Sequence, residues 1–183
     1  IASTDYTPYY DMLRYFKRDY KLIPSTIENN FYPTTDEYLG SNTNDRKLLL
    51  LSNPCNPTGI TRKEDELKGL IEKAQTSGNG ILFDEAYEFF HTPPISSLQF
   101  VNDVNNSNIF VAGAATKGLQ APGIRIGWVV AAKKYIEILG NFSSFGMGGV
   151  SQPSQLYALK LFDEKRIDLA RDTICLLYTS PSP

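Results

Sequence analysis

Short, continuous apolar runs alternate along this chain with stretches in which apolar residues recur at helical spacing. Four of the runs have the length of strands: Lys47–Ser52, Gly80–Phe83, Asn108–Ala112 and Ile126–Ala131. The first of them, KLLLLS, has leucines at consecutive positions, which is typical of a strand buried on both faces of a parallel sheet.

Helical patterns lie between and after these runs. Thr61 and Glu64 have the spacing of a capping box, and Gly78 is suited to the C-terminal end of a helix. The residues between them that share one helical face are Leu67, Leu70, Ile71 and Ala74. Further helices are predicted at Lys133–Leu139 and Ser151–Phe162. Strands that alternate with amphipathic helices predict an α/β fold with three layers, α/β/α, around a mostly parallel central sheet.

Composition narrows the class of protein. The chain has 183 residues, enough for one domain with a proper core. Its 18 basic and 20 acidic residues nearly balance, which argues against a nucleic-acid partner. Since no apolar run reaches the length of a membrane span, we expect no membrane partner. Two cysteines are too few for a disulfide framework, so we expect a reducing compartment and a cytoplasmic protein.

The end of the chain differs from the rest. Residues 175–183, CLLYTSPSP, show neither a helical nor a strand period and finish in Pro and Ser. We therefore expect one domain at residues 1–174 and treat residues 175–183 as a tail that is foreign to it.

Polar clusters follow three of the predicted strands directly. Asn56 lies in NPCNPTG after the first strand, Asp84 and Tyr87 lie in DEAY after the second, and Lys117 comes shortly after the third. Because the carboxyl ends of parallel strands lie along one edge of an open sheet, these side chains should converge there. An amine, a carboxylate and hydrogen-bonding groups at one edge match the needs of pyridoxal 5'-phosphate (PLP).

These motifs also carry a resemblance to a known family. SNPCNPTG, FDEAY and ATKGLQAPGIRIGW resemble, in order and spacing, the signature of fold-type I PLP-dependent enzymes of the class I/II aminotransferase group. The resemblance covers about residues 4 to 165. It implies a PLP-binding large domain that is incomplete at both ends, so we expect the 183 residues alone to be inactive.

The resemblance implies a role for each matching residue. Lys117 corresponds to the catalytic lysine that binds PLP as an imine and later moves a proton as a base. Asp84 corresponds to the partner of the pyridine nitrogen. Asn56 and Tyr87 correspond to the pair that hydrogen-bonds the ring hydroxyl, and Arg125 corresponds to the arginine that binds the phosphate. No metal is assigned to the site.

An aromatic residue is often stacked on the pyridine ring in this family, and Tyr6 falls at that position. Tyr9 and Tyr10 offer competing registers for the same role. The family also often has a cis peptide bond at the second Asn-Pro, here Asn56–Pro57.

Other interpretations of these residues stay open. Asp84 could cap the following helix, Asn56 could be an ordinary turn residue, and an isolated lysine is usually on the surface. The sequence also departs from the family at Ala114, where many relatives have a serine that helps to bind the phosphate. Thr116 is a candidate to replace it.

The resemblance implies an aminotransferase that moves an amino group from an amino acid to a 2-oxo acid, as a homodimer when the protein is complete. A PLP-dependent lyase or cyclase on the same fold is the alternative enzyme, since this fold supports several reactions. A non-catalytic regulator with the same fold is the alternative outside enzymes.

Overall fold

The computed structural model describes residues 1–40 and 46–179. Its sheet consists of β1 (Leu48–Ser52), β2 (Gly80–Asp84), β3 (Ile109–Ala114) and β4 (Gly127–Val130), side by side in that order. β1, β2 and β3 are parallel, whereas β4 is antiparallel to β3. All four strands were predicted from their apolar runs.

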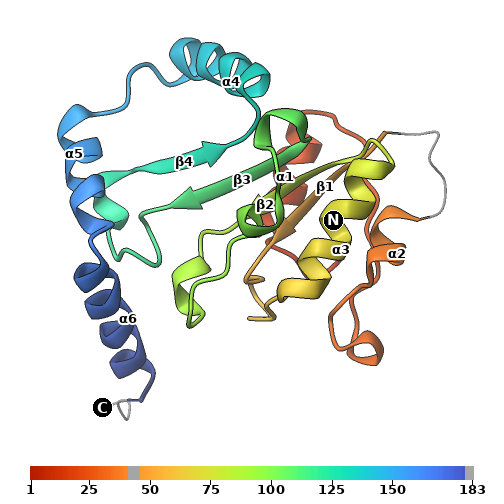
Figure 1. Cartoon of the computed structure of the whole chain (residues 1–183), viewed down its shortest axis with the longest axis horizontal. Helices are drawn as coiled ribbons and strands as arrows, with labels where there is room; N and C mark the ends of the chain where they lie inside the picture. The colour runs from red at the N-terminus through yellow and green to blue at the C-terminus, as the bar shows by residue number, and fades with distance from the viewer. Residues whose placement is uncertain (41–45, 180–183) are drawn as a thin grey trace.

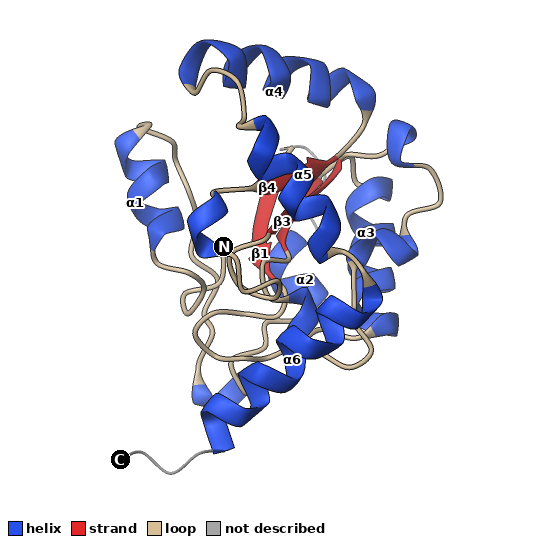
Figure 2. Cartoon of the chain, turned by 90° about the vertical axis from the view of Figure 1, so that its left-hand side faces the viewer, coloured by secondary structure: helices blue, strands red, loops and turns tan. Residues whose placement is uncertain are grey.

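Helices lie on both sides of this sheet, as the predicted three-layer α/β/α fold requires. Figure 2 shows α1 (Pro8–Tyr15) and α3 (Glu64–Thr76) on opposite sides of the strands. The remaining helices are α2 (Thr35–Leu39), α4 (Lys133–Gly146), α5 (Gln152–Leu161) and α6 (Glu164–Thr179). Short 3-10 helices at Ile27–Asn29, Glu88–Phe90, Ser97–Phe100, Val104–Asn106 and Pro122–Ile124 connect them.

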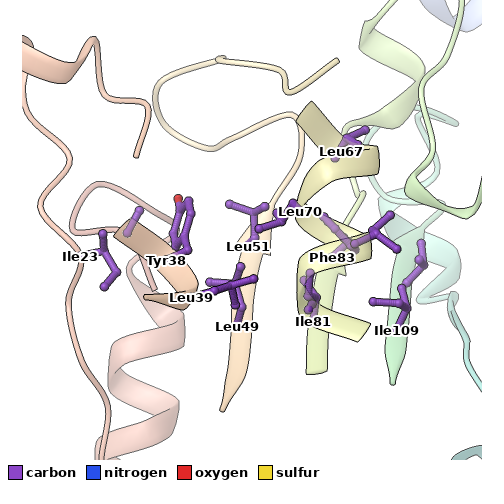
Figure 3. Close-up of a cluster of buried hydrophobic side chains, with 14 of the residues drawn as sticks. Ile23, Tyr38, Leu39, Leu49, Leu51, Leu67, Leu70, Ile81, Phe83 and Ile109 are labelled. Atoms are coloured by element: carbon purple, nitrogen blue, oxygen red, sulfur yellow. The ribbon is translucent and has the colours of Figure 1, made fainter. Parts of the chain in front are cut away.

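The main core lies between the sheet and α3 (Figure 3). Alternate strand residues point toward the helix because the side-chain period of a strand is two. Those on the strands are Leu49, Leu51, Ile81, Phe83, Ile109 and Val111, and those on the helix are Leu67, Leu70, Ile71 and Ala74. The four helix residues are each 0% exposed, so the predicted apolar face of this helix is confirmed.

A smaller cluster lies on the other face of the sheet. Leu50 is buried there with Ile1 and with Tyr9 of α1. Leu49, Leu50 and Leu51 are therefore all buried, as predicted for a strand that is covered on both faces.

The start of α3 corrects one prediction. The helix begins at Glu64, and the backbone N–H of Lys63 donates to Glu66 Oε2 at 3.4 Å, so the capping box predicted at Thr61 and Glu64 is wrong. Arg62 is held outside the helix, because its backbone N–H donates to Asn53 Oδ1 at 2.7 Å. A contact with the loop after β1 thus sets where the helix starts.

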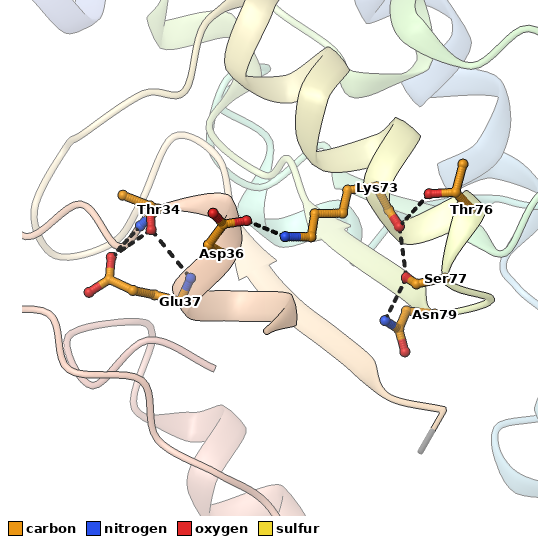
Figure 4. A network of polar contacts seen from close by, with 7 residues as sticks. All are labelled: Thr34, Asp36, Glu37, Lys73, Thr76, Ser77 and Asn79. Carbon is orange, nitrogen blue, oxygen red and sulfur yellow. Dashed lines mark hydrogen bonds and ion pairs between the residues drawn. The ribbon is translucent and has the colours of Figure 1, made fainter. Parts of the chain in front are cut away.

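The end of α3 agrees with the sequence. Gly78 has a φ of 70°, a left-handed conformation that suits glycine after a helix. Polar contacts then attach the neighbouring short helix α2, where Asp36 forms an ion pair with Lys73 of α3 (Figure 4). At the start of α2, the Thr34 hydroxyl accepts from the Glu37 backbone N–H at 3.3 Å.

The opposite flank of the molecule is more exposed. None of the residues of α4 is buried, and Phe145 is 94% exposed. The helix also extends to Gly146, beyond the predicted end at Leu139. Within the described ranges, no helix has the length and apolar character needed to cross a membrane.

The C-terminal helix changes the interpretation of the tail. α6 runs to Thr179, so residues 175–179 are helical and the prediction that they lack a helical period is wrong. These residues continue the helix that begins at Glu164, and the backbone hydrogen bonds of that helix include them. Residues 180–183 of the predicted tail lie outside the described part of the chain.

Candidate active site

A cavity of about 200 Å³ lies at the carboxyl ends of β1, β2 and β3. Its walls contain five of the six predicted site residues, Tyr6, Asn56, Asp84, Tyr87 and Lys117, together with Tyr9, Ser52, Ala86, Ala114 and Thr116. The predicted convergence of three strand ends is thus confirmed for Asn56, Asp84, Tyr87 and Lys117, and Tyr6 lines the same cavity. A larger cavity of about 540 Å³ contains none of them; it lies around the connection between α5 and α6 and is lined by Leu159, Lys160, Phe162, Asp163 and Arg166.

The end of β1 is organised around a buried carboxylate. Asp5 is 1% exposed, and its Oδ1 accepts from the Tyr6 backbone N–H at 2.8 Å and from the Ser52 hydroxyl. Its Oδ2 accepts from the Ser52 backbone N–H at 3.2 Å. The Ser52 hydroxyl oxygen in turn accepts from the Asn56 backbone N–H at 3.3 Å. Asp5 therefore ties the segment before α1 to the loop that carries Asn56. Burial raises the pKa of Asp5, and its three donors oppose that shift.

Asn56 and Tyr87 come together across the cavity wall. Asn56 Nδ2 donates to the Tyr87 hydroxyl at 3.4 Å, although the two residues belong to different strand ends. The predicted cis peptide bond at Asn56–Pro57 is confirmed, and Asn53–Pro54 and Thr92–Pro93 are cis as well. The structure thus forms the amide–phenol pair that the sequence suggested.

Asp84, the last residue of β2, has a donor on each carboxylate oxygen. The Tyr9 hydroxyl donates to Oδ2 at 2.5 Å, and the Ala86 backbone N–H donates to Oδ1 at 3.1 Å. Burial, followed by the nearby charge of Asp84, raises the pKa of Tyr9 well above the usual range of a phenol. Tyr9 therefore keeps its proton and is the donor of this bond.

Tyr9 is the site residue that the sequence interpretation missed. It was considered only as a competitor for the position of Tyr6. Residues three apart on a helical turn lie on one face, a signal that could have placed both at the cavity. Their rings meet edge to face, with centroids 5.3 Å apart.

Glu85 follows Asp84 but points away from the cavity. It is 1% exposed, and its Oε1 accepts from the Ser97 backbone N–H at 2.6 Å. Burial raises the pKa of Glu85, and burial together with the charge of Glu85 raises the pKa of Glu88 to about 7. The strand period thus separates two neighbouring acids, and only Asp84 faces the site.

Lys117 lies in the turn after β3, with its side chain exposed at the cavity wall. Its Nζ is 5.7 Å from the centroid of the Tyr87 ring. The base of the turn is fixed by Ala115, which is 0% exposed and whose backbone N–H donates to Ile126 O at 3.1 Å. A fixed turn thus carries an exposed amine beside the amide–phenol pair.

Arg125 is the one predicted site residue that the structure does not bring to the cavity. It is exposed, has a φ of 54°, and its Nη1 donates to Pro122 O at 3.0 Å. The expectation that Arg125 lines the same cavity is therefore wrong in this structure. Its guanidinium donates within its own turn instead of toward the cavity.

The fold and the cavity define the class of this chain as a three-layer α/β domain with a cavity at the carboxyl ends of parallel strands, where ligands bind in folds of this kind. The family follows from a comparison with known proteins. The chain belongs to the aminotransferase class I and II family, whose model matches residues 1–170.

Individual relatives agree with this assignment. The chain is 27% identical over 163 residues to a probable aspartate/prephenate aminotransferase of Aquifex aeolicus, covering 87% of this chain and 41% of the relative. It is 28% identical over 185 residues to 1-aminocyclopropane-1-carboxylate synthase 6 of Arabidopsis thaliana, covering 92% and 37%. The chain therefore spans less than half the length of these relatives.

A solved structure supports the fold independently. An aminotransferase from Mycobacterium tuberculosis superposes with a TM-score of 0.82 at 19% identity, and the match covers 95% of this chain and 44% of that one.

Proposed function

We propose that the protein to which this chain belongs is a PLP-dependent aminotransferase. It transfers the amino group of an amino acid to a 2-oxo acid, and both are small-molecule substrates. The observation that carries the proposal is that Asn56, Asp84, Tyr87 and Lys117 line one cavity at the carboxyl edge of the sheet.

The donor set of the cavity fits the ring of PLP. The cofactor needs a lysine amine, an acid beside its pyridine nitrogen, and donors for its ring oxygen. The amine is Lys117, the acid is Asp84, and the donors are Asn56 and Tyr87. The phosphate end fits less completely, since Arg125 lies outside the cavity wall and Ala114 has no hydroxyl to donate.

When bound, PLP supplies an aldehyde carbon for the amino group and a ring that accepts electrons. The chain's own residues orient the reacting groups and handle the protons. Asp84 would hold a proton at the pyridine nitrogen, and the Asn56 amide and Tyr87 hydroxyl would bind the ring oxygen. The Lys117 amine would accept the proton that leaves the substrate α-carbon.

The stacking position is proposed for Tyr6, which is 40% exposed at the mouth of the cavity. Arg125 is proposed to bind the phosphate. Its Nη1 bond to Pro122 uses one of five guanidinium donors, so others remain for an anion.

We further propose a homodimer, as the resemblance of the motifs suggests, and a cytoplasmic location, as the two cysteines suggest. The nearly balanced charge, with 18 basic and 20 acidic residues, supports small-molecule partners over nucleic acid. Light scattering of the complete protein measures the oligomeric state, and a monomer would contradict the proposal.

A single-turnover assay tests the reaction. The complete protein with PLP is mixed with one amino acid and no acceptor, and the released 2-oxo acid is counted. An aminotransferase releases about one equivalent per site and then stops until a 2-oxo acid is added. Release that continues without an acceptor would contradict the proposal and indicate a lyase.

The alternative is a PLP-dependent lyase or cyclase that uses the same residues. It is favoured by one observation, the 28% identity to a relative named as a synthase. The same assay separates the two, because only the aminotransferase stops after one equivalent.

A further inference from the structure

We propose that Tyr9 is a positioning residue that fixes the carboxylate of Asp84 toward the pyridine nitrogen of PLP. This inference rests on the proposed function and extends it to a residue outside the matching motifs. Tyr9 belongs to α1, which lies on the side of the sheet opposite α3 (Figure 2). Its side chain lines the cavity.

The contact between the two side chains is close and sheltered. The Tyr9 hydroxyl lies 2.5 Å from Asp84 Oδ2, and Tyr9 is 8% exposed. A hydroxyl that donates to a carboxylate at this distance belongs to the stronger hydrogen bonds in proteins. The phenol stays a donor over the working pH range because burial and the charge of Asp84 raise its pKa.

Two donors together hold the plane of the carboxylate. The Ala86 backbone N–H binds Oδ1 at 3.1 Å, and Tyr9 binds Oδ2. A carboxylate has about four lone-pair positions, so both oxygens can still accept from a ligand. Without the Tyr9 hydroxyl, the carboxylate of Asp84 could rotate about its Cβ–Cγ bond.

Tyr9 itself is rigidly held, as a positioning residue must be. Its ring packs in the cluster with Ile1 and Leu50, and its edge-to-face contact with Tyr6 links it to the proposed stacking residue. Tyr9→Phe removes the hydroxyl but keeps the ring. It should therefore disturb the orientation of Asp84 without leaving a cavity in the core.

The test uses Tyr9→Phe in the complete protein, with Tyr10→Phe as the matched control. Tyr10 is the next residue on the same helix, and its hydroxyl donates to Ala2 O at 2.6 Å instead of to the site. PLP affinity is measured by titration, and the bound cofactor's absorbance is followed as a function of pH. The rate of single-turnover amino transfer is the third readout.

We expect Tyr9→Phe to weaken PLP binding and slow amino transfer by roughly tenfold or more. It should also shift the pH at which the cofactor's absorbance changes. Tyr10→Phe should stay within about twofold of the unsubstituted protein, since a partner outside the site is lost.

A double-mutant cycle separates positioning from a general structural role. In the Asp84→Asn background, adding Tyr9→Phe should change PLP affinity by less than about twofold, because the coupled partner is already gone. Equal effects of Tyr9→Phe in both backgrounds, or effects no larger than those of Tyr10→Phe, would overturn the inference. If the unsubstituted protein binds no PLP, the proposed function itself fails, which is a distinct result.

Discussion

The end of β2 and the end of β3 present their functional side chains in contrasting ways. Asp84, at the end of β2, has a donor on each oxygen, and one donor comes from the buried Tyr9. Lys117, after β3, is exposed at the cavity wall, and the nearby Arg125 donates to Pro122 O of its own turn outside that wall. The carboxylate of the cavity is thus fixed by a long-range contact, whereas its amine is exposed.

This difference suits the chemistry that each side is proposed to perform. A group that holds a proton at one ring nitrogen benefits from a fixed orientation. An amine that must form a bond and later move a proton needs the freedom of its four-carbon stem. The contrast therefore predicts which substitutions lower the rate of amino transfer and which weaken the binding of PLP.

The largest effect is expected from Lys117→Ala. Amino transfer should fall by about 10⁴-fold or more, because both the covalent attachment of PLP and the proton transfer are lost. Steady-state rates of the complete protein measure it. Lys133→Ala, at an exposed lysine paired with Glu137, is the matched control and should keep normal turnover. Substantial activity without Lys117 would rule out its assigned role.

The next effect is that of Asp84→Ala. We expect a loss of about 10²- to 10³-fold in rate at saturating PLP, since a fixed charge is removed where the ring needs it. Cofactor affinity should fall much less, because the phosphate contacts remain. Rates and PLP titrations of the complete protein give the two numbers. Near-normal turnover with PLP saturating would contradict the pyridine role.

Arg125→Ala tests whether this exposed arginine binds the phosphate. PLP affinity should fall by roughly tenfold, and the rate at saturating PLP should be retained, because a phosphate contact binds without taking part in the reaction. Arg166→Ala, an arginine in α6 beside the larger cavity, is the control. Unchanged affinity would mean that Arg125 stays bonded to its own turn.

The smallest effect concerns stability at Glu88, just beyond the β2 end. Burial, followed by the charge of Glu85, raises its pKa to about 7, so its charged form is disfavoured in the folded state. Stability should therefore fall as pH rises from the usual glutamate range through 7. Glu88→Gln should match the unsubstituted protein at low pH and exceed it by roughly 1–2 kcal/mol above pH 7. Thermal unfolding across this pH range measures the difference, and parallel curves would contradict the shift.

Much of the fold could be predicted because its signals are local. The four apolar runs are strands, and the functional residues of three polar clusters lie where parallel strands end. Asn56, Asp84, Tyr87 and Lys117 reach the cavity because each follows a strand closely in sequence.

The remainder depends on contacts between distant residues. The Tyr9 and Asp84 bond joins residues 75 apart, and the Asp5 and Ser52 bonds join residues 47 apart, with no local pattern to reveal them. The positive φ of Arg125 and its bond to Pro122 O could not be predicted either, because an arginine rarely adopts that conformation.

The central claim, that this cavity binds PLP covalently through Lys117, has one direct test. The complete protein is loaded with PLP, treated with borohydride, which reduces an imine to a stable amine, and then digested and mapped by mass spectrometry. We expect a pyridoxyl label on Lys117, and loss of that label in Lys117→Ala. A label on a different lysine, or no label while PLP is bound, would contradict it.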